Sequence, residues 1–180
     1  MSGSVIGIKL NLGWLGKITR SADNIVETRV VSDTETLGIE FGAPVFINDD
    51  NTIRNALATA DTLAKFAGFA IAEVRQSTTY GVDGNFAKYL PNTSCDILTR
   101  GSIIAVLGLG DGANVPVAGG AVFVRTELNA LDAPYDGALV GDVEVKADGT
   151  NTIKIPASFT TGYVDGNNCV EVTLQTKNSI

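Results

Sequence analysis

One stretch, residues 95–126, constrains the fold of this 180-residue chain more than any other. It holds two apolar runs, residues 97–107 and 117–125, which are rich in Val, Ile and Phe. The segment between them carries glycine, aspartate, asparagine and proline, the residues that end strands and form turns. Residues 121–124 are consecutively apolar, which favours a strand buried on both faces. We therefore expect a two-stranded hairpin at the centre of a β-barrel or β-sandwich.

Further strands are expected along the rest of the chain. Residues 37–48 form an apolar run broken at Gly42, and a glycine inside a strand is typical of a bulge or a barrel corner. Alternation of apolar and polar residues elsewhere predicts strands with one face in water. The other expected strands are residues 24–31, 66–76, 142–146, 152–155 and 170–175, of which the last three alternate.

The predicted fold class is mainly β. A single β-barrel or sandwich-like core is expected, with which a β-tulip-like or β-clip-like arrangement is compatible. At most one short helix is expected, and its candidate is the Ala- and Leu-rich segment 52–65. Residues 1–36 have short apolar patches cut by glycines and are predicted to form an extended N-terminal arm. Residues 37–180 are predicted to form the core domain.

Charge and composition limit the classes of partner. The net charge of −7 argues against nucleic-acid binding, which needs a basic surface. No apolar run approaches the length of a membrane span, and no secretion signal is recognisable, so no membrane partner is expected. Both cysteines, Cys95 and Cys169, are expected to be reduced core residues. Residues 1–31 hold four basic and two acidic side chains, which favours a mildly basic arm, or simply a solvated surface.

The residues that most catalytic and cofactor sites need are missing. The chain has no histidine, which removes Ser-His-Asp catalysis, Cys-His catalysis and His-containing metal sites. Its Asp-Gly pairs lack the spacing of a calcium loop and are interpreted as turns. The glycines of residues 108–112 do not match a dinucleotide-binding fingerprint. We therefore predict no cofactor and no enzymatic activity.

Candidate binding residues lie in the arm and in one long loop. Trp14, the only tryptophan, stands between glycines, and large aromatic side chains dominate interface hot spots. Packing of Trp14 back onto its own subunit is the alternative. The loop at residues 77–94 carries three aromatic side chains that would either contact a neighbour or bury the base of the loop. The candidate partner or oligomer contacts are Lys9, Leu12, Trp14, Leu15, Lys17, Ile18, Arg20, Tyr80, Phe86 and Tyr89.

Six blocks, in order, carry a resemblance to a known family. They are residues 17–31 (KITRSADNIVETRVV), 39–48 (IEFGAPVFIN), 66–80 (FAGFAIAEVRQSTTY), 95–107 (CDILTRGSIIAVL), 116–126 (PVAGGAVFVRT) and 155–174 (IPASFTTGYVDGNNCVEVTL). With these blocks the chain resembles the capsid cement, or decoration, proteins of tailed bacteriophages. Residues 50–65 depart from the family pattern, which leaves their local structure open.

The resemblance implies a structural, non-enzymatic virion protein. Such a protein would be made in the host cytoplasm and would bind the exterior of the assembled capsid. It would contact the major capsid (coat) protein, bridge neighbouring coat subunits and form a homo-oligomer, with a trimer favoured. Two other hypotheses stay open: a trimeric β-fold hydrolase that uses carboxylates and a metal, and a host-surface or tail-associated binding module.

Overall fold

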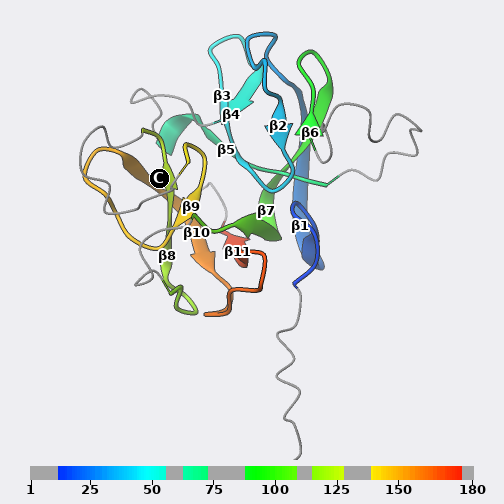
Figure 1. Cartoon of the computed structure of the whole chain (residues 1–180). Helices are drawn as coiled ribbons and strands as arrows, with labels where there is room; N and C mark the ends of the chain where they lie inside the picture. The colour runs from blue at the N-terminus through cyan, green and yellow to red at the C-terminus, as the bar shows by residue number, and fades with distance from the viewer. Residues whose placement is uncertain (1–11, 56–62, 73–87, 109–114, 128–138, 176–180) are drawn as a thin grey trace, which may run out of the picture.

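The structure is a computed structural model that describes residues 12–55, 63–72, 88–108, 115–127 and 139–175. These residues form eleven strands and one short 3₁₀ helix, η1 (Figure 1). The elements are β1 (Ile18–Val30), β2 (Ile39–Glu40), β3 (Pro44–Ile47), β4 (Ile53–Asn55), η1 (Leu63–Lys65), β5 (Phe66–Ala70), β6 (Lys88–Tyr89), β7 (Ser94–Val106), β8 (Ala121–Arg125), β9 (Val143–Glu144), β10 (Thr152–Phe159) and β11 (Cys169–Leu174). The expected mainly β fold is confirmed. No helix in the described part is long and apolar enough to cross a membrane.

One large sheet organises the molecule. Its strand order is β4-β3-β5-β7-β11-β10-β8-β9, and β1 pairs with β7 as a branch from this path. All the paired strands are antiparallel, and β2 and β6 form a separate small sheet. In the described residues β4 and β9 do not pair, so the sheet is sandwich-like and does not close into a barrel. In Figure 1, β1 runs along one flank of the molecule, beside β7.

The core divides into two clusters that β5 and β7 separate. Leu98 on β7 and Phe69 on β5 belong to the larger cluster, whereas their neighbours Ile97 and Ala70 belong to the smaller one. Successive residues of a strand point to opposite faces, so β7 is buried on both sides. Residues 103–105 are consecutively apolar and fully buried, which agrees with the predicted central position of this strand.

The expected hairpin between residues 97–107 and 117–125 is wrong. The strands form, but β11 and β10 lie between β7 and β8 in the sheet. β11 pairs with β7 from Cys169↔Val106 to Leu174↔Gly101, which occupies the edge that a hairpin would have used. Burial of residues 121–124 on both faces is also wrong, because buried and half-buried side chains alternate along this part of β8.

The expected helix over residues 52–65 is wrong at its start. Ile53–Asn55 is strand β4, which pairs with β3 through Phe46↔Arg54 and its neighbours. Leu63–Lys65 is a single 3₁₀ turn, and the residues between lie outside the described part. Pairing with a neighbouring strand has here overridden the local preference of the sequence.

Two of the alternating strands carry buried acids on the faces predicted to be wet. Glu144 is 2% exposed and pairs with Arg125, and Glu171 is 7% exposed beneath Thr19 and Arg20. An inward acid next to an inward arginine breaks the rule that charges face water. Both cysteines are free and buried, as predicted.

Residues 12–36 contribute directly to the large sheet. The strand predicted over residues 24–31 is longer than expected, and β1 pairs with β7 from Ile18↔Ile103 to Val30↔Ser94. Val31, just beyond β1, is fully buried in the smaller cluster. A domain boundary at residue 36 stays a prediction. The predicted break at Gly42 is confirmed, since it separates β2 from β3 with a φ of +76°.

Candidate functional site

The segment before β1 is fastened to the large sheet. The backbone N–H of Gly16 donates to the carbonyl of Ile104 at 2.9 Å, and the N–H of Ile104 donates to the carbonyl of Lys17 at 3.0 Å. Further back, the N–H of Leu12 donates to the Asp165 carboxylate at 3.2 Å. These bonds hold residues 12–17 against the sheet.

Two glycines allow this close approach. Gly16 and Gly42 have φ values of +73° and +76°, where glycine is favoured. A Cβ at Gly16 would lie 2.6 Å from the backbone N of Ala72, and one at Gly42 would lie 2.6 Å from the carbonyl O of Ile104. Because backbone atoms cannot move aside as a flexible side chain can, both positions exclude a larger residue.

The fastened segment presents Trp14 to solvent. A turn, closed by the N–H of Lys17 donating to the Trp14 carbonyl at 3.2 Å, leaves the Trp14 side chain 61% exposed. Lys17 Nζ lies 5.1 Å from the centroid of the indole ring, within the range of a cation–π contact. We refer to residues 13–17 as the Trp14 turn. It combines an exposed aromatic ring, a cation and a backbone held by the sheet.

The other predicted contact residues in residues 12–20 have mixed environments. Leu15 packs partly against the smaller core cluster, and Ile18 packs partly against the larger one. The Arg20 side chain is 64% exposed, and its Nε donates to Glu171 at 3.2 Å. Leu12 is half-buried. The predicted contact residues from 12 to 20 thus lie on one segment along the sheet, and Trp14 and Arg20 are the most exposed of them.

The predicted aromatic loop gives a different result. Tyr89 lies on strand β6 and is 1% exposed, with its ring edge-to-face against Phe41 at 5.2 Å. Its hydroxyl donates to the carbonyl of Ile71 at 2.8 Å. Tyr89 therefore packs in the core, which is the second of the two alternatives for this loop. Lys9, Tyr80 and Phe86 lie outside the described residues.

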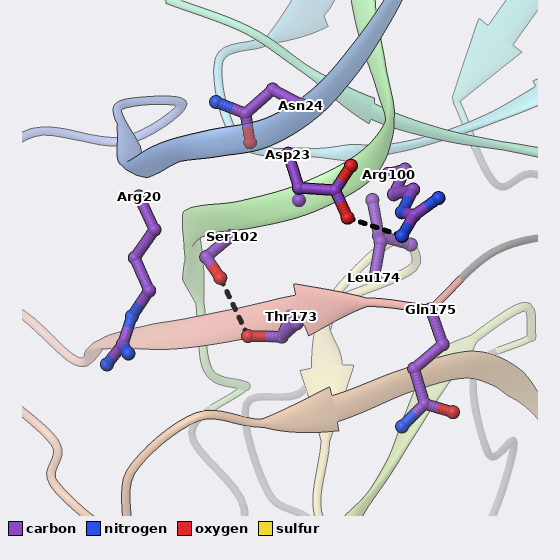
Figure 2. Close-up of a pocket in the computed structure, with 9 residues that line it drawn as sticks. Arg20, Asp23, Asn24, Arg100, Ser102, Thr173, Leu174 and Gln175 are labelled. Carbon is purple, nitrogen blue, oxygen red and sulfur yellow. Dashed lines mark hydrogen bonds and ion pairs between the residues drawn. The ribbon is translucent and has the colours of Figure 1, made fainter.

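A polar hollow of about 400 Å³ opens beside β1 (Figure 2). It forms because Arg20 pairs with Ser102 while Ile25 pairs with Arg100, so residues 21–24 of β1 have only Gly101 opposite them. A strand with extra residues bends away from its partner. The lining residues are Arg20, Asp23, Asn24, Arg100, Gly101, Ser102, Thr173, Leu174 and Gln175.

Four of the side chains that line the polar hollow bind one another in two pairs. Arg100 forms an ion pair with Asp23, and Figure 2 shows both groups at one side of the opening. The Ser102 hydroxyl hydrogen-bonds to that of Thr173 at 2.8 Å. Charges of both signs and paired hydroxyls suit contact with a polar protein surface. Among the described residues, no group of three or more Cys, Asp or Glu side chains could hold a metal ion.

A second hollow, of about 430 Å³, has a more apolar lining and was not found from the sequence. Leu37 and Leu139 line it and are 78% and 65% exposed. Phe41 and Val140 add further apolar surface. For Leu37, its place between a polar stretch and Gly38 is a signal that could have indicated an exposed leucine, whereas Leu139 stands in an apolar run and gave no such signal.

The second hollow contains a carboxyl with a raised pKa, that of Asp142. Burial raises the pKa of this carboxyl to about 6, although the backbone N–H of Leu139 donates to it at 2.7 Å and opposes the rise. In the same lining, Lys88 pairs with Glu40 at 3.2 Å, and the charge of Glu40 adds to the rise in the pKa of Asp142. The hollow therefore combines exposed leucines with a carboxyl that titrates near neutral pH.

Comparison with known proteins places these features in a family. A model of the XM1 gp53 minor capsid protein family matches residues 3–174. Among solved structures, a chain in "The capsid of Myoviridae Phage XM1" superposes with a TM-score of 0.64 at 15% sequence identity. That match covers 98% of this chain and 99% of the other, so the two share a fold over their whole lengths. No curated protein matches the chain. From the family match, the chain belongs to the XM1 gp53 minor capsid protein family.

Proposed function

We propose that this chain is a structural protein of a phage virion that binds the exterior of the assembled capsid and bridges neighbouring coat subunits. The observation that carries the proposal is the match of a minor capsid protein family to residues 3–174. The fold shared with a chain in a phage capsid supports it. The proposed role is non-enzymatic and needs no cofactor.

The Trp14 turn is the proposed contact with the major capsid protein. The indole ring of Trp14 is 61% exposed, yet the backbone of the turn is hydrogen-bonded to β7 through the Gly16 N–H and the Lys17 carbonyl. A partner that buries this ring gains apolar area without paying to order a flexible loop. Lys17 adds positive charge beside the ring, which suits an acidic coat surface.

Stabilisation of the shell follows from binding that requires assembled coat subunits. A ligand that binds only the assembled state shifts the equilibrium toward that state. We infer that the chain acts as a homotrimer, since linked copies that engage several coat subunits gain avidity. Light scattering on the purified chain tests this step, and a mass other than three protomers contradicts it.

A co-sedimentation assay tests the function. Purified chain is mixed with empty capsids and spun, and the bound fraction is measured for wild type, W14A and V117A. Val117 is a matched control because it is also an exposed apolar residue, at 67%. Wild type and V117A are expected to pellet with the shells, whereas W14A should bind more weakly by about tenfold or more.

Other outcomes would favour the other hypotheses. Absence of wild-type binding to shells, combined with affinity for host surface material, favours the host-surface module. Metal-dependent hydrolysis of nucleotides or glycans by the purified chain favours the hydrolase.

A further inference from the structure

The Trp14 turn alone is too small to hold the coat protein. Trp14 is the most exposed residue of this turn, and its side chain is 61% exposed. A whole aromatic side chain buries about 150–250 Å². A stable interface buries about 800 Å² on each partner. A partner that binds the turn must therefore also cover the surface beside it.

The second hollow adjoins this turn. Phe41 and Gly42 line the hollow and also pack against the turn, since a Cβ added at Gly16 would lie 3.0 Å from the Phe41 Cβ and 3.0 Å from the Gly42 N. The same hollow is lined by Leu37 and Leu139, which are 78% and 65% exposed. Apolar side chains gathered at the surface are typical of protein contact sites. The hollow thus supplies apolar area that the turn lacks.

The charges of the hollow indicate what would fill it. Its described lining holds three acidic side chains, Glu35, Glu40 and Asp142, and one basic side chain, Lys88. Lys88 pairs with Glu40 at 3.2 Å. Glu35 and Asp142 accept backbone N–H groups, and in the described part of the chain neither has an ion-pair partner. Covering a carboxylate without a cation is costly, so an apolar group that enters the hollow should bring a cation with it.

We propose that the second hollow binds a segment of the coat protein in which a lysine or arginine stands next to a large apolar side chain, so that one continuous coat contact runs from the Trp14 turn into the hollow. The apolar side chain packs against Leu37 and Leu139, and the cation lies beside Asp142. This inference rests on the proposed function and extends its contact surface. The coat is the occupant because the hollow continues the surface of the turn that binds it.

Co-sedimentation with empty capsids tests the apolar part of the contact. L37A/L139A removes both exposed leucines. L63A is the matched control, because Leu63 is also exposed, at 48%, and does not line the hollow. Exposed side chains contribute little to stability, so both variants should fold as wild type does. The double variant should bind shells more weakly by about tenfold or more, and L63A should bind as wild type does.

D142N tests the charge. The asparagine keeps an oxygen that can accept the Leu139 N–H, so the change removes the negative charge and little else. At pH 8, D142N should bind shells more weakly by about threefold or more, since a cation in the hollow loses its partner. E127Q is the matched control, because Glu127 is an exposed acid that does not line the hollow. E127Q should bind as wild type does.

Photo-cross-linking identifies the occupant. The photoreactive residue p-benzoylphenylalanine replaces Leu139, or Leu63 as the control, and the chain is irradiated on empty capsids. Mass spectrometry then identifies the linked peptide. The expected product from position 139 is a coat peptide with a lysine or arginine next to a large apolar residue, at several times the yield from position 63.

Three results overturn the proposal. They are a cross-link from position 139 to another copy of this chain, binding of L37A/L139A equal to that of L63A, and binding of D142N equal to that of E127Q. Wild type that does not bind shells at all contradicts the proposed function itself. Weak binding of W14A together with unchanged binding of L37A/L139A contradicts this inference alone.

Discussion

Arg125 on β8 and Glu144 on β9 form a two-point ion pair inside the core, where each side chain is 2% exposed. Asp148 accepts from the same guanidinium at 3.1 Å, and the carbonyl of Glu127 accepts at 3.2 Å. Burial raises the pKa of Glu144, and the hydrogen bonds from Arg125 oppose the rise. Burial lowers the pKa of Arg125, but its hydrogen bonds to Glu144 and Asp148 raise it by more, so the guanidinium keeps its charge inside the core and needs these acceptors.

Neutralising Glu144 should lower the stability of the fold. E144Q removes the negative charge that pairs with the buried guanidinium at two points and leaves the ion pair with Asp148 in place. We expect the free energy of unfolding to fall by about 3 kcal/mol, in the range for breaking a buried pair from one side. Urea unfolding followed by circular dichroism measures this difference.

A matched control and a double variant separate charge from packing. Glu127 is exposed and contributes only its backbone carbonyl to the network, so E127Q should change stability by less than about 0.5 kcal/mol. R125M/E144L, which removes both charges, should recover part of the loss. An E144Q variant as stable as E127Q would contradict the role of the pair.

The sequence predicts the centre of the fold better than its edges. The run in β7 is apolar on consecutive residues because the strand is buried on both faces, and this local signal is readable. On the edge where a hairpin was expected, the partner of β7 is β11, which begins more than sixty residues after β7 ends. No local signal encodes that pairing. Glu144 was expected in water because its neighbours alternate. Its burial depends on Arg125, which only the β8–β9 pairing brings near.

The candidate site, too, was only partly predictable, because the exposure of each side chain depends on pairings between distant strands. Trp14 stands out as a single large aromatic residue between glycines, and the structure leaves it exposed. Tyr89 was also a predicted contact, on an expected loop, but it lies in the core, because β6 pairs with β2 and Phe41 packs against its ring. The second hollow joins residues from distant segments, such as Leu37 and Leu139, so its existence depends on tertiary structure alone.

Asp142 should make stability depend on pH. The pKa of an ordinary Asp carboxyl is 3.8, whereas the pKa of Asp142 in the folded chain is about 6. The folded chain therefore binds this proton more tightly than the unfolded chain. Ionised Asp142 therefore opposes folding: the cost appears above about pH 4 and is complete above about pH 6. D142N should stabilise the protein at pH 8 by about 1–2 kcal/mol, less than the full shift implies because solvent screens the site.

The pH profile distinguishes this cause from a packing effect. The gain of D142N over wild type should shrink toward zero as the pH falls from 8 to 4, measured by denaturant unfolding at each pH. Asparagine can still accept the Leu139 N–H, so the hydrogen bond is kept. A gain that is constant across this range would show that ionisation of Asp142 is not its source.

Gly42 should tolerate alanine poorly. Its φ of +76° disfavours a side chain, and the added Cβ would also meet the backbone of Ile104 and Gly16 at 2.6 and 2.8 Å. Gly149 has a φ of +50° with nothing within 4 Å, so G149A isolates the conformational cost of about 1–2 kcal/mol. We expect G42A to lower the thermal midpoint clearly more than G149A. Equal losses would mean that the packing of Gly42 against Gly16 contributes nothing.

Trp14 and Tyr89 should separate binding from stability. W14A removes an exposed ring and should change the free energy of unfolding by less than about 1 kcal/mol, the size of an exposed cation–π contact. Y89A empties a core position and should cost about 3–5 kcal/mol. Denaturant unfolding of both variants checks this, and a W14A loss near that of Y89A would place the indole ring in the core.

The location of the chain on the virion is the most direct test of the proposed function. Empty capsids incubated with the purified chain would be imaged by electron cryo-microscopy, and the difference density compared with that of bare capsids. If the proposed function holds, density lies on the outer surface, across the junctions between coat subunits, with the Trp14 turn at the contact. Density inside the shell, or over the middle of single coat subunits without a bridge, would contradict it.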